Sequence, residues 1–278
     1  MKRLPALLVS ALLIFCFALS GCSSSGVKFV VLEEDFGYEE YGIGMRKGDN
    51  ALTLALQEAL DAVIADGTAA EISKKWFGED KLLKDKPFPR EIVDTGDDSL
   101  QYIKDKGTLI LGLDVGFEPM GFYDDKGEIV GFDIDLAKEV AKRLGVELVL
   151  QPISWDAKEM ELENKSIDVV WNGMSITPER AEAMNISKPY LANRMIVIVR
   201  EDSGIKTLAD LAGKKVACQA GSSALDAINS KPEIASTFGE LISSYGDNPT
   251  AFLDLKSGRI DALVVDEVVG LNLIEKNS

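Results

Sequence analysis

The sequence of 278 residues contains no histidine, and this absence excludes several kinds of chemistry. Without an imidazole there is no Ser-His-Asp or Cys-His nucleophile, no histidine ligand for zinc and no proton shuttle of the usual kind at neutral pH. Basic residues are also few, 30 against 46 acidic residues, which gives a formal net charge of -16. A nucleic acid or another polyanionic partner is therefore not expected.

Long apolar runs are also scarce, and the one near the N-terminus is short for a membrane span. It covers residues 4–19 and follows two basic residues. Its last residue begins the sequence Leu-Ser-Gly-Cys, residues 19–22. This ending resembles a bacterial lipoprotein signal. The resemblance implies that residues 1–21 are a signal peptide cleaved before a lipidated Cys22, and that residues 22–26 are the anchor and tether of an extracytoplasmic protein held at the cell membrane.

Cysteine occurs three times, which leaves no disulfide within the mature chain. Cys16 would leave with the signal and Cys22 would carry lipid, so Cys218 would be the remaining thiol. Cys218 stands in an apolar Val-Ala-Cys run, and we expect it to be a small buried side chain and not a nucleophile.

What the chain does have is an alternation of apolar strands and amphipathic helices. With 46% hydrophobic residues, it can form one large or two modest domains. Helices are expected over residues 51–66 and 132–144, with another beginning at residue 68. This alternation indicates an α/β fold with largely parallel sheets and ligands at the carboxyl ends of the strands. The predicted strands are 29–32, 41–45, 109–113, 148–153, 169–171, 196–199, 216–218 and 262–265.

The most informative segment is residues 171–180, Trp-Asn-Gly-Met-Ser-Ile-Thr-Pro-Glu-Arg, where a buried strand passes into a helix. Thr177 is a good N-cap, followed by a proline at the first helical position. The free N–H groups there attract an anion, and Arg180 adds a planar pair of donors suited to a carboxylate. Gly173 allows close approach to the backbone, and Ser175 adds a hydroxyl. The alternative is a capped helix with a surface arginine.

This segment resembles the ligand loop of the polar amino-acid-binding proteins of ABC importers, the bacterial extracellular solute-binding proteins of family 3 type. Residues 107–144, 214–224 and 258–267 are similar to other parts of that family. The resemblance implies a two-lobe periplasmic-binding-protein fold of type II, in which each lobe is a mostly parallel sheet flanked by helices. It also implies a monomer, without cofactor or metal, that captures a polar L-α-amino acid between its lobes and delivers it to ABC permease subunits.

The order of the segments differs from the family's, because the part similar to residues 29–78 comes last in the family and first here. The chain therefore resembles a circular permutant, with residues 79–98 as the linker that joins the former termini. Such rearrangement is tolerated at exposed loops. We expect lobe 1 to cover residues 37–190 and lobe 2 to combine residues 27–36 with residues 191–278.

The resemblance also implies roles for the residues that would hold the two ends of an amino acid. Arg180 would clamp the α-carboxylate, with help from Ser222 and Ser223. Asp266, at the end of a predicted strand, would take the α-ammonium together with Gly173 and Ser175. A solvated acid or a helix cap is the alternative for Asp266.

Four further residues are expected around the side chain of the amino acid. Phe117 and Trp155 occupy positions that sandwich the ligand in relatives, although core packing is the alternative for both. Asp114 resembles a carboxylate that meets a distal polar or cationic group. Asn172 stands where many relatives have a serine, so the identity of the amino acid stays open.

The alternative from another class is an enzyme on the same scaffold. Cyclohexadienyl dehydratases resemble these binding proteins and use a carboxylic acid in the pocket as a proton donor. Asp114, Glu118 or Glu267 could supply that acid if burial raised its pKa. The amino-acid clamp explains more of the residues, so a binding protein without enzymatic activity is the prediction.

Overall fold

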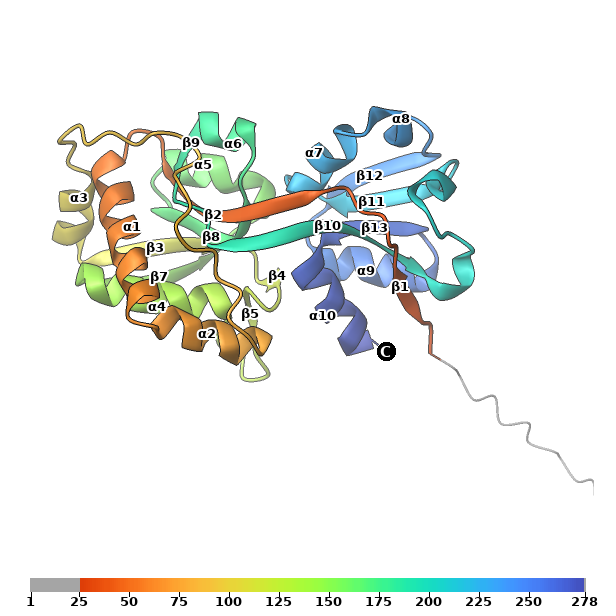
Figure 1. Ribbon diagram of the computed structural model, residues 1–278, viewed down its shortest axis with the longest axis horizontal. Helices are drawn as coiled ribbons and strands as arrows, with labels where there is room; N and C mark the ends of the chain where they lie inside the picture. The colour runs from red at the N-terminus through yellow and green to blue at the C-terminus, as the bar shows by residue number, and fades with distance from the viewer. Residues whose placement is uncertain (1–25, 278) are drawn as a thin grey trace, which may run out of the picture.

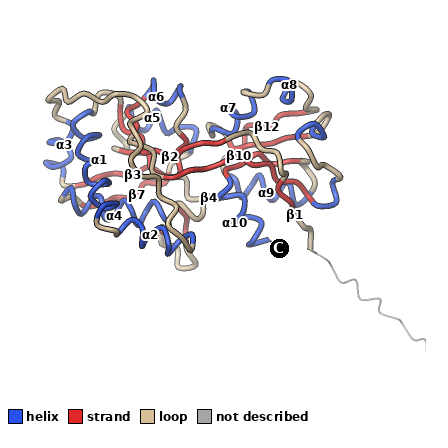
Figure 2. The backbone as a smooth tube through the Cα atoms, viewed as in Figure 1, coloured by secondary structure: helices blue, strands red, loops and turns tan. Residues whose placement is uncertain are grey.

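The computed structural model describes residues 26–277, and the predicted signal and Cys22 lie outside this part of the chain. Figure 1 shows two lobes joined by two long strands that run from one lobe into the other. Each lobe consists of a sheet with helices on its faces, and Figure 2 shows the strands forming an almost continuous layer through the middle of the molecule. No helix of the described residues is long and apolar enough to cross a membrane.

The bounds of the elements follow the apolar runs and caps of the sequence. The strands are β1 (Phe29–Val31), β2 (Tyr38–Arg46), β3 (Thr108–Leu113), β4 (Gly116–Phe117), β5 (Gly121–Tyr123), β6 (Ile129–Val130), β7 (Glu147–Pro152), β8 (Val169–Ser175), β9 (Met184–Ile186), β10 (Leu191–Arg200), β11 (Lys215–Gln219), β12 (Glu240–Tyr245) and β13 (Ala262–Asp266). The helices are α1 (Asn50–Ala65), α2 (Thr68–Phe77), α3 (Ser99–Lys106), α4 (Phe132–Leu144), α5 (Lys158–Glu163), α6 (Pro178–Ala183), α7 (Ser223–Asn229), α8 (Pro232–Ala235), α9 (Asn248–Ser257) and α10 (Glu267–Asn277).

The strand order β12-β11-β13-β10-β2-β8-β3-β7 runs through both lobes. In what we call the first lobe, β3 lies parallel to β7 and β8; in the second lobe, β11 lies parallel to β12 and β13. The strands β2 and β10 lie antiparallel to their neighbours, so the sheet is mixed where the lobes meet. The predicted two-lobe α/β fold is confirmed.

The hinge between the lobes is formed by β2 and β10. Residues 191–194 of β10 pair with residues 38–41 of β2, and residues 195–199 of β10 pair with β13 of the second lobe. From Tyr41 onward β2 pairs with β8 of the first lobe. A rotation of one lobe against the other must therefore bend both strands near these pairs.

The first strand of the described chain belongs to the second lobe. Residues 29–31 pair antiparallel with residues 198–200 of β10, and β10 in turn pairs with β13. The prediction that residues 29–32 join the sheet of residues 262–265 is confirmed. The chain then enters the first lobe through β2.

Residues 79–98 cross the surface of the first lobe from α2 to α3, over α1 and the hinge (Figure 1). The Leu83 N–H donates to the Tyr190 carbonyl at 2.9 Å, and Leu82 bridges to Leu191 at the start of β10. The segment lacks a helix of its own, as its prolines and charges predict, yet it is attached to the hinge by backbone hydrogen bonds.

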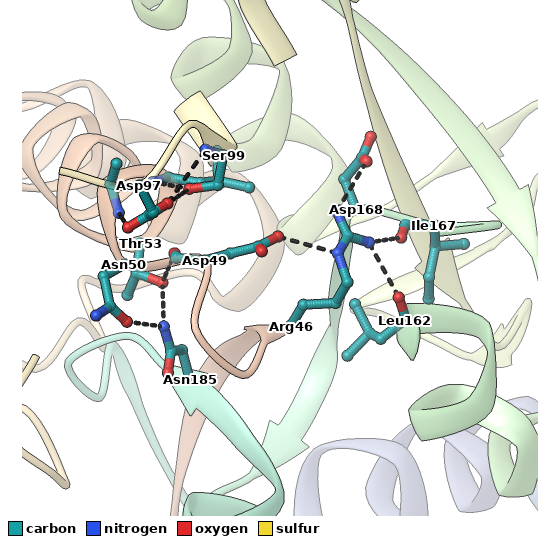
Figure 3. Close-up of polar contacts among 12 residues, drawn as sticks. Arg46, Asp49, Asn50, Thr53, Asp97, Ser99, Leu162, Ile167, Asp168 and Asn185 are labelled. Atoms are coloured by element: carbon teal, nitrogen blue, oxygen red, sulfur yellow. Dashed lines mark hydrogen bonds and ion pairs between the residues drawn. The ribbon is translucent and has the colours of Figure 1, made fainter. Parts of the chain in front are cut away.

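Asp97 of this segment and Ser99 of α3 cap α1, whose own preceding residue Asp49 makes no side-chain cap. The Ala51 N–H donates to Asp97 Oδ2 at 3.0 Å and the Leu52 N–H donates to Ser99 Oγ at 2.9 Å (Figure 3). These two bonds satisfy donors that every helix start leaves free. They join residues almost fifty positions apart, so no local pattern predicts them.

Candidate functional site

The predicted helix start after β8 is confirmed and holds Arg180 between the lobes. Thr177 Oγ1 accepts from the Arg180 N–H at 3.2 Å, and Pro178 is the first residue of α6. Arg180 is 7% exposed; its Nη1 donates to the Ser175 carbonyl at 2.8 Å and its Nη2 donates to the Gly221 carbonyl of the second lobe at 3.0 Å. Burial lowers the pKa of Arg180, yet an arginine stays charged at any working pH.

A second cation, which the sequence analysis missed, points at the same carbonyl. Lys158 is 2% exposed, and its Nζ donates to the Gly221 carbonyl at 2.9 Å and to the Trp155 carbonyl at 3.2 Å. Burial, then the charge of Arg180, lowers the pKa of Lys158 to about 8. A lysine in a short polar helix is normally solvated, so the sequence carried no signal for this position.

The loop after β11 meets these cations from the second lobe. Gly221 has a φ of +66°, and a Cβ there would lie 2.7 Å from Asp156 Cα, so no side chain fits. Ser223 Oγ donates to Ser175 Oγ of the first lobe at 2.9 Å. Ser222 Oγ instead donates to the Gln219 carbonyl of its own loop at 2.8 Å. Ser223 therefore bridges the lobes directly, whereas the Ser222 hydroxyl is bonded within the loop.

Asp266, at the end of β13, is buried and contacts both hinge strands. Its Oδ1 accepts from the Tyr41 hydroxyl at 2.7 Å and from Asn193 Nδ2 at 2.8 Å. Burial, followed by the charge of Glu39, raises the pKa of Asp266 to about 7. Glu39 Oε2 accepts from Ser175 Oγ at 2.8 Å and from Asn193 Nδ2 at 3.2 Å. Sequence reasoning missed Glu39, Tyr41 and Asn193, which come from the hinge strands.

Asp114, directly after β3, lies beside Asn172 in the middle of β8, where the predicted side-chain pocket should be. The Asp114 N–H donates to Asn172 Oδ1 at 3.0 Å, and Asp114 Oδ2 accepts from Gln219 Nε2 of the second lobe at 2.6 Å. Burial raises the pKa of Asp114. Asn172 Nδ2 is buried without a hydrogen-bond partner among residues 26–277. Gln219 was not predicted, although it directly precedes the loop that was.

Gly173 has a φ of +57°, and its N–H donates to Asp133 Oδ2 at 2.7 Å. A Cβ at Gly173 would lie 2.6 Å from Phe117 Cε1, so the phenyl ring packs on the loop backbone. Asp133 is fully buried at the start of α4, and its Oδ1 accepts from the Tyr190 hydroxyl at 2.8 Å. Burial raises the pKa of Asp133 to about 7. This carboxyl thus connects the loop to the entry of hinge strand β10.

The two predicted aromatic residues belong to different hydrophobic clusters. Phe117 is part of the large core that includes Leu113 and Trp171. Trp155 packs with Val170 and Met174 in a smaller cluster behind the loop, and Lys158 Nζ lies 5.2 Å from its ring centroid. Both rings are largely buried, so core packing accounts for part of their surroundings.

Cys218 is the small buried side chain that the sequence predicts. Cys218 is free and buried in β11, and burial raises its pKa to about 12. A thiol with this pKa is protonated at neutral pH and a poor nucleophile.

Comparisons with known proteins find relatives of this chain. The family model of bacterial extracellular solute-binding proteins, family 3, matches residues 14–79 and 109–241. An L-cystine-binding protein of Escherichia coli (strain K12) is 33% identical over 80% of this chain and 76% of its own. ABC transporter arginine-binding protein 1 of the same strain is 35% identical over 57% of this chain and 63% of its own.

Solved structures give the same grouping. A histidine-bound ABC substrate-binding protein from Streptococcus pneumoniae superposes with a TM-score of 0.63 at 37% identity, covering 66% of this chain and 75% of that one. The arginine-bound ArgBP from T. maritima gives 0.58 at 40% identity, covering 64% and 82%. An ancestral amino-acid-binding protein described as a precursor of cyclohexadienyl dehydratase gives 0.59 at 35% identity, covering 64% and 78%. Together with the family model, these matches show that the chain belongs to the bacterial extracellular solute-binding proteins, family 3.

Proposed function

We propose that this chain captures a polar L-α-amino acid between its lobes and delivers it to an ABC-type permease. The observation that carries the proposal is the distribution of charge around Ser175. The Ser175 carbonyl accepts from the buried Arg180, and the Ser175 hydroxyl donates to Glu39, which lies beside Asp266. An α-amino acid carries its carboxylate and its ammonium on one carbon atom. These two charges would match the buried cation Arg180 and a pair of acids, the buried Asp266 and the half-buried Glu39.

The carboxylate end would be held by Arg180 and Lys158. Both cations now donate to one neutral carbonyl, that of Gly221. A carboxylate offers a charged acceptor in its place, and hydrogen bonds between charged groups are roughly twice as strong as neutral ones. The ligand would thereby strengthen the contact between the lobes.

The mechanism would be capture by hinge closure, without a covalent step. The contacts between the lobes, which include Ser223 with Ser175 and Gln219 with Asp114, form only when the lobes are close together. An amino acid that binds residues of both lobes favours the closed form by its differential affinity. The distal groups Asp114 and Asn172, with Phe117 and Trp155, would contact its side chain.

Permutation and membrane anchoring are part of the same proposal. The two separate matches of the family model, residues 14–79 and 109–241, and the pairing of β1 in the second lobe support a circularly permuted order. In that order residues 79–98 join the former termini, lobe 1 covers residues 37–190, and the rest of the folded chain forms lobe 2. A lipid on Cys22 would hold this monomer outside the cytoplasmic membrane.

A thermal-shift screen of the protein with the common L-amino acids and L-cystine tests the proposal. A ligand present at about 100 times its dissociation constant should add about 2.7 kcal/mol to the free energy of unfolding. A screen in which no amino acid raises the melting temperature would refute the proposal.

Two of the three acids that could act as proton donor in the enzyme alternative are engaged in ion pairs. Glu118 forms an ion pair with Lys276, and Glu267 forms one with Arg194, so each is already paired with a cation of the protein. Asp114 is buried with a raised pKa and would be the proton donor. Release of phenylpyruvate from prephenate or arogenate by the purified protein would favour the enzyme; its absence would leave the binding protein.

A further inference from the structure

The acid end of the proposed site contains two carboxylates that share one donor. Asn193 Nδ2 lies 2.8 Å from Asp266 Oδ1 and 3.2 Å from Glu39 Oε2. We propose that Glu39 and Asp266 bind the α-ammonium of the amino acid jointly, and that its binding displaces a proton from this pair. The inference rests on the proposed function and adds Glu39 as a residue that selects for a ligand with a free α-ammonium.

The geometry leaves this pair of acids without a cation of its own. Neither Glu39 nor Asp266 has an ion-pair partner among residues 26–277. The charge of Arg180 lowers the pKa of Asp266, but the two terminal nitrogens of Arg180 donate to the Ser175 and Gly221 carbonyls. Asp266 is buried and Glu39 is half-buried. Buried charges are normally paired, so an ionised Asp266 lacks a positive partner.

An ammonium group fits this deficiency. It carries three N–H donors and no acceptor, so it can donate to both carboxylates and keep one donor for a neighbouring oxygen. Ser175 Oγ, which already donates to Glu39, brings such an oxygen to the same place. The Asn193 side chain, bonded to both acids, holds them at a fixed separation.

A proton takes the place of the ammonium until the amino acid binds. The titratable or charged groups that face Asp266 are Glu39 and Tyr41 on β2 and Arg180 on α6, while β10 presents the neutral Asn193. Burial and the charge of Glu39 raise the pKa of Asp266 to about 7, so below this pH the carboxyl is mostly protonated. An arriving ammonium favours the ionised form and drives the proton off. Affinity should therefore rise as the pH rises toward about 7 and change little above it.

Isothermal titration calorimetry at about pH 6.5, in two buffers with different ionisation enthalpies, measures this proton directly. L-arginine is the probe, with L-cystine where L-arginine does not bind, because neither titrates near that pH. Lys158 is fully protonated there and contributes no proton of its own. We expect the release of more than about half a proton for each amino acid bound.

Glu39→Gln is the variant, and Glu40→Gln is its matched control. Glu40 is the next residue of β2 and makes the same change of charge, but it forms an ion pair with Lys86 of the surface segment at 2.7 Å. We expect Glu39→Gln to weaken binding at least about tenfold and to reduce the proton release, because Asp266 loses the neighbour that raises its pKa. Glu40→Gln should stay within about twofold of the parent.

Each outcome bears on a different claim. If the parent binds neither probe, the proposed function fails for these ligands and the inference fails with it. If the parent binds but Glu39→Gln stays within about threefold of it with unchanged proton release, Asp266 alone holds the ammonium and the inference is wrong. If Glu39→Gln does not fold, the parent still decides, because binding without proton release at about pH 6.5 contradicts the inference.

Discussion

Replacement of Arg180 by alanine should abolish tight binding of an amino acid while leaving the fold intact. Arg180 is buried, and its Nη1 and Nη2 donate to two carbonyls, one in each lobe. In the proposed complex both nitrogens face a carboxylate, which makes the contact a two-pronged charged one. Truncation of one partner of such a buried pair costs about 2–5 kcal/mol. The dissociation constant should therefore rise by roughly thirtyfold to several thousandfold.

The fold should survive because Arg180 contributes its backbone, not its side chain, to the start of α6. The bond from its N–H to Thr177 Oγ1 remains in the alanine variant. Burial lowers the pKa of Arg180, so the folded chain bears a desolvation cost that the variant removes. The free energy of unfolding without amino acid should change by about 1 kcal/mol or less.

Calorimetric titration measures the affinity, and urea unfolding measures the stability. Arg90→Ala is the matched control, since Arg90 is exposed and forms its ion pair with Glu182 on the outside of the first lobe. Lys158→Ala separates the two cations, and we expect a smaller loss than for Arg180 because a lysine has no planar fork. An Arg180→Ala protein that binds within about threefold of the parent would refute the assignment of the carboxylate site.

Three further changes test other parts of the structure. Asp114→Asn should alter the ranking of amino acids in a thermal-shift screen more than it alters all affinities, because in the proposed complex Asp114 contacts the side chain of the amino acid; a uniform loss would contradict this. Asp133→Asn should flatten the pH dependence of stability. Burial raises the pKa of Asp133 to about 7, so urea unfolding of the parent should show the unfolding free energy falling by up to about 1.4 kcal/mol per unit as the pH rises from about 4 to 7. An equal slope in both proteins would count against it. Asp97→Ala removes an acceptor from the start of α1 and should cost about 1 kcal/mol in thermal unfolding, whereas no loss would show that the cap is dispensable.

Much of the fold could be predicted from local sequence patterns, because buried parallel strands are apolar and the helices that cover them are amphipathic. The β12 strand was missed because its central Ser243 and Ser244 break the alternation on the outermost strand of the sheet. The helix start at Thr177 and Pro178 was predicted correctly because capping is decided by neighbours in the chain.

The candidate site was predictable only where a residue stands in a local sequence motif at the end of a strand. Arg180 and Asp266 each stand in such a motif. Lys158 does not, and it joins the site only through its hydrogen bond to the Gly221 carbonyl, more than sixty residues later. The same holds for Tyr41 and Asp266, which are separated by 225 positions. Contacts of this length depend on how the lobes pack against one another, which no local pattern describes.

The acid end of the site contains three residues that were missed, and all of them belong to the hinge. Glu39 and Tyr41 lie on β2, Asn193 lies on β10, and all three surround Asp266 at the point where these strands pair with each other. A ligand that pairs with Glu39 and Asp266 is thus bonded to a hinge strand and to the second lobe at once. Closing the lobes bends β2 and β10 at the same residues. We therefore expect the occupancy of the ammonium position to influence the hinge directly, whereas Arg180 acts across the cleft between the lobes.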